Sequence, residues 1–174
     1  MARRSYASLS SELRTQLEAV EPSTDFGVIN YRPCCVTLAT GETRDFVYLV
    51  EARTYYQIWG VWPEDDPGKK ELPLGRISAI HDSPARLPAA LANKLYAAGE
   101  SGMGYFVFTV VLRDGRQLAF VPGNAVDFPS LPHGVTSSDI VDVLPGTGWA
   151  EGLRDRPPLP SESAADYLWC LYGE

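Results

Sequence analysis

Residues 105–122 read YFVFTVVLRDGRQLAFVP and hold the strongest local structural signal in the chain. The run 105–112 is almost entirely aromatic or β-branched, which is typical of a buried strand. The Asp114-Gly115 pair that follows favours a tight turn between two strands. We therefore predict a β-hairpin in which residues 117–122 return antiparallel to residues 105–112.

A second hairpin is predicted nearer the start of the chain. Apolar and polar residues alternate within 44–52, and the short turn TGET at 40–43 joins this run to the apolar run 34–39. Further runs with strand character are 54–62, 75–81 and 139–144. Together these segments predict a mostly antiparallel sheet of about six to seven strands, built from hairpins.

Two or three helices are expected to pack on this sheet. Leucines recur at helical spacing within 10–20, and an apolar stripe follows the same spacing in 88–98. The last residues, 161–172, resemble a terminal helix that follows an extended, proline-rich segment at 152–161. The expected fold class is α+β, with residues 1–174 forming a single domain.

Charge restricts the partners that the chain can have. The formal net charge is −7, and residues 121–174 alone carry 8 acidic and 2 basic side chains, a net −6. Such a chain repels phosphate groups, so we expect neither nucleic acid nor a membrane surface as a partner. A basic protein partner fits this charge, although acidity can also serve solubility alone.

The cysteines and the first residues indicate a reducing compartment. The chain has 3 cysteines, Cys34, Cys35 and Cys170, which is a poor basis for a disulfide framework. No apolar segment of signal-peptide type follows Arg3-Arg4, and no 18-residue apolar run is present. We therefore expect free thiols and a cytoplasmic setting.

One combination of residues could support catalysis. Cys35 or Cys34 could act as a nucleophile with His81 as its base and Asp82 as the orienting group. Neither cysteine lies at an expected helix N-terminus, where a thiolate would be stabilised. A small cysteine-dependent hydrolase is thus the alternative function, and structural cysteines in a buried strand are the competing interpretation.

Metal, cofactor and phosphate sites are not predicted. Gly99, Gly102 and Gly104 follow an expected helix and precede a strand, which is the reverse of the order in a phosphate-binding loop. Asp127, Asp139 and Asp142 could meet around a cation, but no metal-ligand spacing supports this. We expect no metal and no cofactor.

Aromatic residues gather between positions 46 and 62, and they carry the preferred prediction. If 54–62 is a strand, rings point to both of its faces, so one set either packs under a helix or forms a contact surface. The candidate partner-binding residues are the anchors Tyr55, Trp59 and Trp62, the steering charges Glu64, Asp65 and Asp66, and a second acidic patch of Asp139 and Asp142.

The stretch LANKLYAAGESGMGYFVFTVVLRDGRQLAFVPGNAVDF, residues 91–128, resembles a segment of small uncharacterised bacterial proteins. In its acidity and its lack of catalytic motifs the chain also resembles immunity proteins of bacterial toxin systems. That resemblance implies a non-catalytic, cytoplasmic protein that neutralises a cognate toxin by stoichiometric occlusion. It transfers no catalytic residue to this chain.

Overall fold

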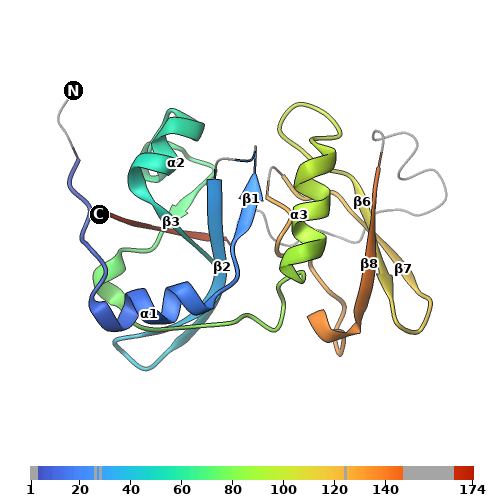
Figure 1. The fold of residues 1–174 in the computed structure, drawn as a ribbon, viewed down its shortest axis with the longest axis horizontal. Coiled ribbons are helices and arrows are strands. Elements are labelled where there is room, and N and C mark those ends of the chain that lie inside the picture. Colours follow the sequence, from blue (N-terminus) through green and yellow to red (C-terminus); the bar gives the residue numbers. More distant parts are fainter. Residues whose placement is uncertain (1–3, 26, 28, 124, 147–166) are drawn as a thin grey trace. The chain divides into compact units, whose positions relative to one another are not determined.

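The computed structural model describes residues 4–25, 27, 29–123, 125–146 and 167–174. The chain divides into two compact units (Figure 1), one made of residues 1–22, 29–83 and 165–174, the other of residues 23–28 and 84–164. The single domain expected for residues 1–174 stays a prediction, because two compact units can fold together or separately. Among the described residues, no helix is both long and apolar enough to cross a membrane.

The α+β class is confirmed. Described helices pack on a mixed sheet and on a three-stranded antiparallel sheet. The α-helices are α1 (Ser11–Ala19), α2 (Ala52–Trp59) and α3 (Ala89–Ala98), and the 3-10 helices are η1 (Pro63–Asp65), η2 (Leu74–Arg76) and η3 (Ser137–Asp139). The strands are β1 (Ser23–Asp25), β2 (Ile29–Leu38), β3 (Thr43–Glu51), β4 (Lys70–Glu71), β5 (Ile77–His81), β6 (Phe108–Leu112), β7 (Gln117–Phe120), β8 (Ile140–Pro145) and β9 (Leu168–Tyr172).

The hairpin predicted from residues 105–122 is confirmed in the second unit. Strands β6 and β7 pair antiparallel, with Phe108 opposite Phe120, and β8 pairs with the other edge of β6. Gly115 has a φ of 88°, the left-handed conformation that the Asp-Gly turn requires. Helix α3 begins after Pro88, as its apolar stripe predicts, and packs on β8.

A buried polar network completes the second unit. The Asp127 carboxylate, with no exposed surface, accepts hydrogen bonds of 2.5 Å from the Ser23 and Tyr96 hydroxyls. Arg86 donates to the Ser23 hydroxyl at 2.9 Å. Because a buried carboxylate needs such donors, Asp127 ties β1 and α3 together and is not free to bind a cation.

The first unit contains the second predicted hairpin. Strands β2 and β3 pair antiparallel around a turn at Gly41, and β5 pairs with β2. Strand β9 lies parallel between β3 and β4. Helix α1 begins as predicted at the Ser10 cap, whose hydroxyl accepts a hydrogen bond from the Leu13 amide at 3.2 Å.

The terminal helix predicted at 161–172 is wrong over residues 168–172, which form β9. A five-residue apolar run such as LWCLY fits the period of a strand as well as that of a helix, so the pattern alone does not decide. In the structure β9 fills the space between two strands, where both of its edges find backbone partners. The rest of that predicted helix and the proline-rich segment 152–161 lie outside the described residues.

The strand predicted at 54–62 is also wrong, because residues 52–59 form helix α2. The Glu51 carboxylate caps this helix, accepting hydrogen bonds from the Arg53 amide at 2.9 Å and the Thr54 amide at 2.7 Å. Gly60, at a φ of 65°, ends it. These local hydrogen bonds outweigh the β-propensity of the aromatic run.

The mixed sheet of the first unit has an aliphatic face and an aromatic face. Along β3, Val47 and Leu49 belong to an aliphatic cluster that includes Leu17 of α1. Tyr48 points to the opposite face, since side chains alternate along a strand. The aromatic face contains the interlocked rings of Tyr31, Tyr48, Tyr55, Trp59 and Trp169.

Trp169→Ala should lower the free energy of unfolding by about 3–5 kcal/mol, because it opens a cavity among these rings. Trp169 is 3% exposed and contacts four other aromatic rings. Urea denaturation followed by circular dichroism measures the loss. Met103→Ala is the control, since Met103 is 99% exposed and should change stability by less than about 0.5 kcal/mol. Equal stability of the two variants would contradict the central place of Trp169.

Candidate partner-binding site

Trp62 is the centre of the candidate site on the first unit. Its ring stacks on Tyr56 with centroids 4.4 Å apart and contacts Tyr6 at 5.3 Å. The Arg4 guanidinium lies 5.9 Å from the Trp62 centroid, within the range of a cation–π contact. Trp62 is only partly buried, so part of this side chain stays accessible on a base of other rings.

A glycine that ends α2 and a proline that begins η1 place Trp62 in a link outside the sheet. Helix α2 stops at Gly60, and the chain then turns into η1, where Pro63 occupies the first helical position. Trp62 therefore lies in the link between two helices, beside the outer face of α2 that carries Tyr56. Burial of Pro63 holds this link against the unit.

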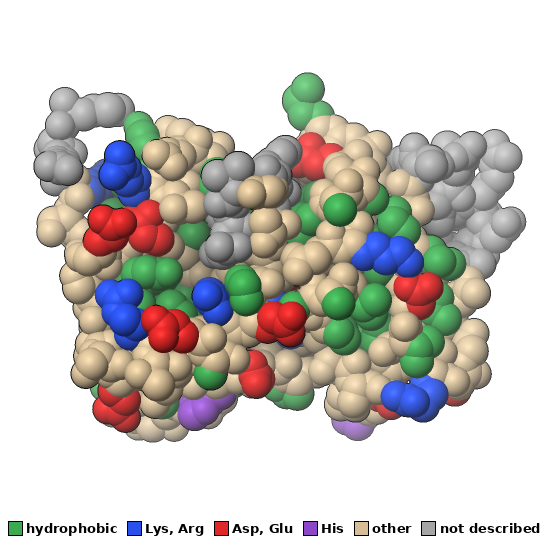
Figure 2. Space-filling view, viewed as in Figure 1, with side chains coloured by type: hydrophobic (Ala, Val, Ile, Leu, Met, Phe, Trp, Pro, Cys, Tyr) green, Lys and Arg blue, Asp and Glu red, His purple; other side chains and the backbone are tan. Residues whose placement is uncertain are grey.

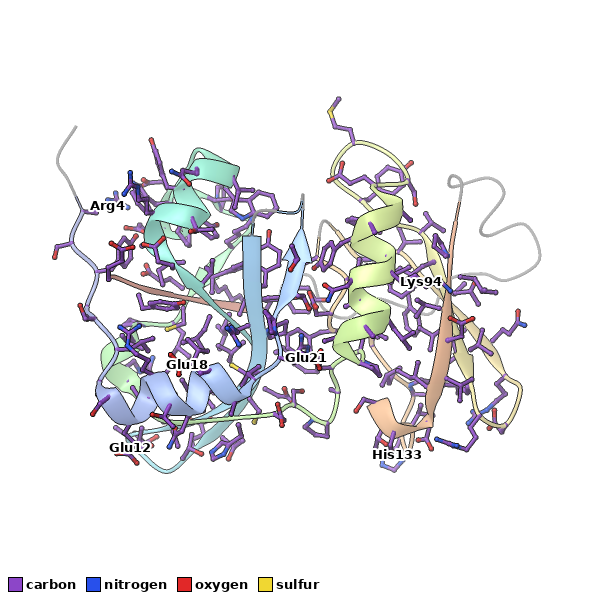
Figure 3. The ribbon with its side chains drawn as sticks, viewed as in Figure 1. Arg4, Glu12, Glu18, Glu21, Lys94 and His133 are labelled. Carbon is purple, nitrogen blue, oxygen red and sulfur yellow. The ribbon has the colours of Figure 1, made fainter. Side chains whose placement is uncertain are left out.

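The acidic residues next to Trp62 already have cationic partners. Arg4 forms an ion pair with Glu64 and another with Asp65 at 3.1 Å. Asp66 pairs with Lys69 at 3.1 Å, and a hydrogen bond from the Gly68 amide, together with Lys69, lowers the pKa of Asp66. Figure 2 shows such neighbouring basic and acidic side chains on the visible face, and Figure 3 places Arg4 beside α2.

The segment Arg4–Ser8, here called the N-terminal strap, borders two hollows. The first, of about 950 Å³, is lined by α2 residues with Trp62 and Asp65. The second, of about 400 Å³, is lined by Glu64, Glu71 and Leu171 among others. Arg4 and Tyr6 line both hollows, so the strap forms a common wall.

The strap is anchored at its far end by the end of β9. The Gly173 amide donates to the Ala7 carbonyl at 2.9 Å, and the Ser8 hydroxyl donates to the Glu174 carbonyl at 2.7 Å. A Cβ atom on Gly173 would lie 2.6 Å from the Tyr6 carbonyl oxygen, so only glycine permits this approach. The strap is thus held by backbone contacts at one end and by Arg4 at the other.

The predicted anchors Tyr55 and Trp59 lie deeper than Trp62. Tyr55 has no exposed surface, and its ring packs on Trp59 and Trp169. Trp59 is partly buried beneath the Lys69 ammonium group, which lies 4.3 Å from its ring centroid. Tyr55 and Trp59 share a face of α2 through the i, i+4 spacing of a helix. Tyr55 and Trp59 therefore belong to the packing that underlies the site, and Trp62 is the predicted anchor at the surface of the site.

The second predicted acidic patch belongs to the other unit. The Asp139 carboxylate accepts a hydrogen bond from the Thr136 amide at 2.9 Å and so caps η3. Asp142 pairs at 2.9 Å with Lys94, which is labelled in Figure 3, and the hydrogen bond from that ammonium lowers the pKa of Asp142. Both carboxylates therefore have structural partners within the second unit.

Tyr6, Glu64 and Glu71 line the smaller hollow, and the buried Tyr55 lies near enough to interact with them electrostatically. Burial and then the nearby Glu64 raise the pKa of Glu71. Burial, Glu64 and Glu71 together raise the pKa of Tyr6 to about 12. Burial and then Asp66 raise the pKa of Tyr55. The cluster concentrates negative potential and favours a positively charged group beside it.

Sequence reasoning missed Arg4, Tyr6, Tyr56 and Glu71 as members of the site. Arg4 and Glu64 are 60 positions apart, and no periodicity connects them. Tyr56 was visible as an aromatic residue, but its contact with Trp62 depends on the helix that replaces the predicted strand. A strap contact of this kind leaves no local signal, since it depends on tertiary folding alone.

Of the two cysteines that the alternative hydrolase function could use, the structure brings only Cys35 next to His81. Cys35 lies directly opposite His81 in the β2–β5 register, whereas Cys34 points into the aliphatic cluster. The His81 Nε2 atom is hydrogen-bonded to the Thr37 hydroxyl at 2.9 Å. Burial and then Asp45 raise the pKa of the Cys35 thiol, the opposite of what a nucleophile needs.

A β-bulge accompanies Cys35. The register from Cys34–Val47 to Val36–Arg44 places Asp45 and Phe46 of β3 opposite the single residue Cys35. Phe46 has a φ of 59°, a strained conformation for a side chain of its size. The Asp45 carboxylate accepts a hydrogen bond from the Ser83 hydroxyl at 2.6 Å, and this fixes the negative charge near the thiol.

Comparisons with protein-family models, with curated proteins and with solved structures find no match to this chain. Within the ranges that the structure describes, His, Cys, Asp and Glu side chains form no group of three that could hold a metal ion.

All three cysteines should react slowly with iodoacetamide in the folded chain near neutral pH, because all are buried and burial raises the thiol pKa values of Cys35 and Cys170. Asp45→Asn should speed the reaction of Cys35 severalfold, since it removes a charge that raises the thiol pKa. Mass spectrometry of the alkylated peptides measures the rates. Asp114→Asn, a carboxylate of the second unit, is the control. A single fast thiol in the unmodified chain would favour the hydrolase instead.

Glu71→Gln should raise the free energy of unfolding at neutral pH. The folded-state pKa of Glu71 lies above its unfolded value of 4.5, so the folded chain loses stability as the pH rises through this range. The amide variant has no such loss, and its advantage should vanish in acid. Urea denaturation across the acid-to-neutral range measures it, with the exposed Glu21→Gln as control. An advantage that is independent of pH would contradict this explanation.

Proposed function

We propose that this chain is a non-catalytic, cytoplasmic binding protein of the immunity type, which neutralises a cognate bacterial toxin by stoichiometric occlusion. The observation that carries the proposal is Trp62, an accessible ring held between Tyr56 and Tyr6 and bordered by Glu64 and Asp65. Aromatic anchors inside a polar rim are typical of the centre of a protein interface.

The packing beneath Trp62 supports this function, because a pre-ordered anchor loses little entropy on binding. Tyr56 supports the ring from α2, and α2 itself rests on Trp169 through Tyr55. The groove of about 950 Å³ beside Trp62 offers a concave surface to a projecting loop or side chain. An interface of ordinary size, about 1,600 Å² in total, would extend well beyond this groove.

The charge of the chain supports a basic partner. The net charge of −7 speeds the encounter with a positively charged protein, and Glu64 and Asp65 lie exposed at the site where that encounter would end. A toxin that acts on nucleic acid has such a basic surface. Occlusion by an acidic protein would cover the surface that the toxin needs for its substrate.

The second candidate function is a small cysteine-dependent hydrolase. The register that places Cys35 opposite His81 favours it, since sequence separation alone did not require the two to meet. The raised thiol pKa and the hydrogen bond that occupies His81 argue for the binding protein instead.

Co-expression with the product of the neighbouring gene tests the proposal. We expect that product to stop growth when expressed alone and this chain to restore growth. Trp62→Ala should weaken the complex by about 2 kcal/mol, measured by calorimetry with the purified pair, because it removes the central anchor. Leu144→Ala, which removes an exposed apolar side chain of the second unit, should bind as the unmodified chain does.

Higher salt should slow the association of the unmodified pair, since steering between opposite charges is screened. Full protection and unchanged affinity with Trp62→Ala would show that the partner binds elsewhere. A neighbouring product that is harmless alone, or one that this chain does not bind, would refute the immunity function.

A further inference from the structure

We propose that Glu64, Asp65 and the face of Trp62 form a guanidinium-binding subsite, which Arg4 occupies in this structure and into which the partner inserts an arginine in place of Arg4. The inference rests on the proposed function for the source of the incoming arginine. The subsite itself rests on contacts within the first unit.

Arg4 shows how the subsite recognises its ligand. Its guanidinium forms ion pairs with Glu64 and Asp65 and lies against the ring of Trp62. Two acceptors and an aromatic face suit a planar, multidentate cation better than the compact ammonium group of lysine. The chemistry of the arrangement therefore selects arginine.

The contact that Arg4 makes is weak enough to be exchanged. The Arg4 side chain is 36% exposed, and its partners Glu64 and Asp65 are 37% and 52% exposed. Exposed ion pairs contribute little to stability because water competes for both charges. An arginine delivered by a partner would meet the same carboxylates with that water excluded, which strengthens each interaction.

A buried polar group without a hydrogen-bond partner in the described part of the chain also lies near the subsite. The Tyr55 hydroxyl is buried, belongs to a side chain with no exposed surface, and has no hydrogen-bond partner among the described residues. Asp66, Tyr6, Glu64 and Glu71 all act on it electrostatically, so it lies near the same cluster. A hollow of about 400 Å³ lies beside Glu64 and Glu71, which leaves room for an incoming chain.

The strap can release Arg4 without losing its other attachment. Hydrogen bonds from Gly173 and Ser8 hold the strap at its far end and do not involve Arg4. Exchange of one guanidinium for another would therefore open the wall between the two hollows and leave the sheet unchanged.

The test is an NMR titration of the ¹⁵N-labelled full chain with N-acetyl-arginine amide, following the indole N–H signal of Trp62. A Trp62→Phe sample assigns that signal. Arg4→Ala should bind this probe about three- to tenfold more tightly than the unmodified chain, because the internal competitor is gone. Arg4→Lys should fall between the two, and N-acetyl-lysine amide should bind more weakly than the arginine probe.

The triple change Arg4→Ala, Glu64→Gln, Asp65→Asn is the matched control, and it should abolish the response of the Trp62 signal. The remaining amide signals report whether each variant keeps its fold. Arg4→Ala that binds the probe no more tightly than the unmodified chain would overturn the proposal. A triple variant that binds the probe as well as Arg4→Ala does would overturn it too.

The result of this titration does not depend on whether the proposed function is correct. Tight probe binding by Arg4→Ala, combined with no toxin partner in the co-expression experiment, would keep the subsite and refute the immunity function. Partner binding that depends on Trp62, combined with no probe binding, would keep that function and refute the arginine subsite.

Discussion

The stacked pair of Tyr48 and Trp169 is the contact on which the first unit depends. Their ring centroids lie 4.6 Å apart at an interplanar angle of 15°, across the parallel pairing of β3 with β9. This pairing joins residues more than a hundred positions apart, and it brings Trp169 under the rings of Tyr55 and Trp59. The burial of these large rings compensates for the ordering of a distant chain segment.

The candidate site follows from that base by a short series of contacts. Helix α2 rests on Trp169 with its inner face, and its outer face presents Tyr56 to Trp62. The end of β9 also receives the N-terminal strap, since Gly173 pairs with Ser8. A single strand thus supports the ring, the groove beside it and the segment that carries Arg4. Because this support is rigid, Trp62 would lose less entropy on binding than an exposed aromatic side chain without such packing.

Charge is distributed differently from what the overall composition indicates. The last third of the chain holds most of the net negative charge, yet two of its acidic residues, Asp127 and Asp142, are engaged with Ser23, Tyr96 and Lys94. The carboxylates with accessible surface at the candidate site come from the middle of the chain instead. The net charge therefore supports a basic protein partner, and the local geometry supports the surface around Trp62 as the place where it would bind.

Local sequence signals determined the α+β class, both hairpins, α1 and α3, and the concentration of aromatic residues around Trp59 and Trp62, because turns, caps and apolar periodicity act over a few residues. Tertiary structure decided the identity of β9, whose short aromatic run suits either a helix or a strand until neighbouring strands supply edge partners. Helix α2 is set by local groups, the Glu51 cap and Gly60, which the aromatic pattern of the segment concealed. Tertiary structure also decided which rings are buried and that Arg4 meets Glu64, since contacts between distant segments depend on how the whole unit packs. The meeting of Cys35 with His81 has the same origin, because strand register belongs to the sheet and not to either strand alone.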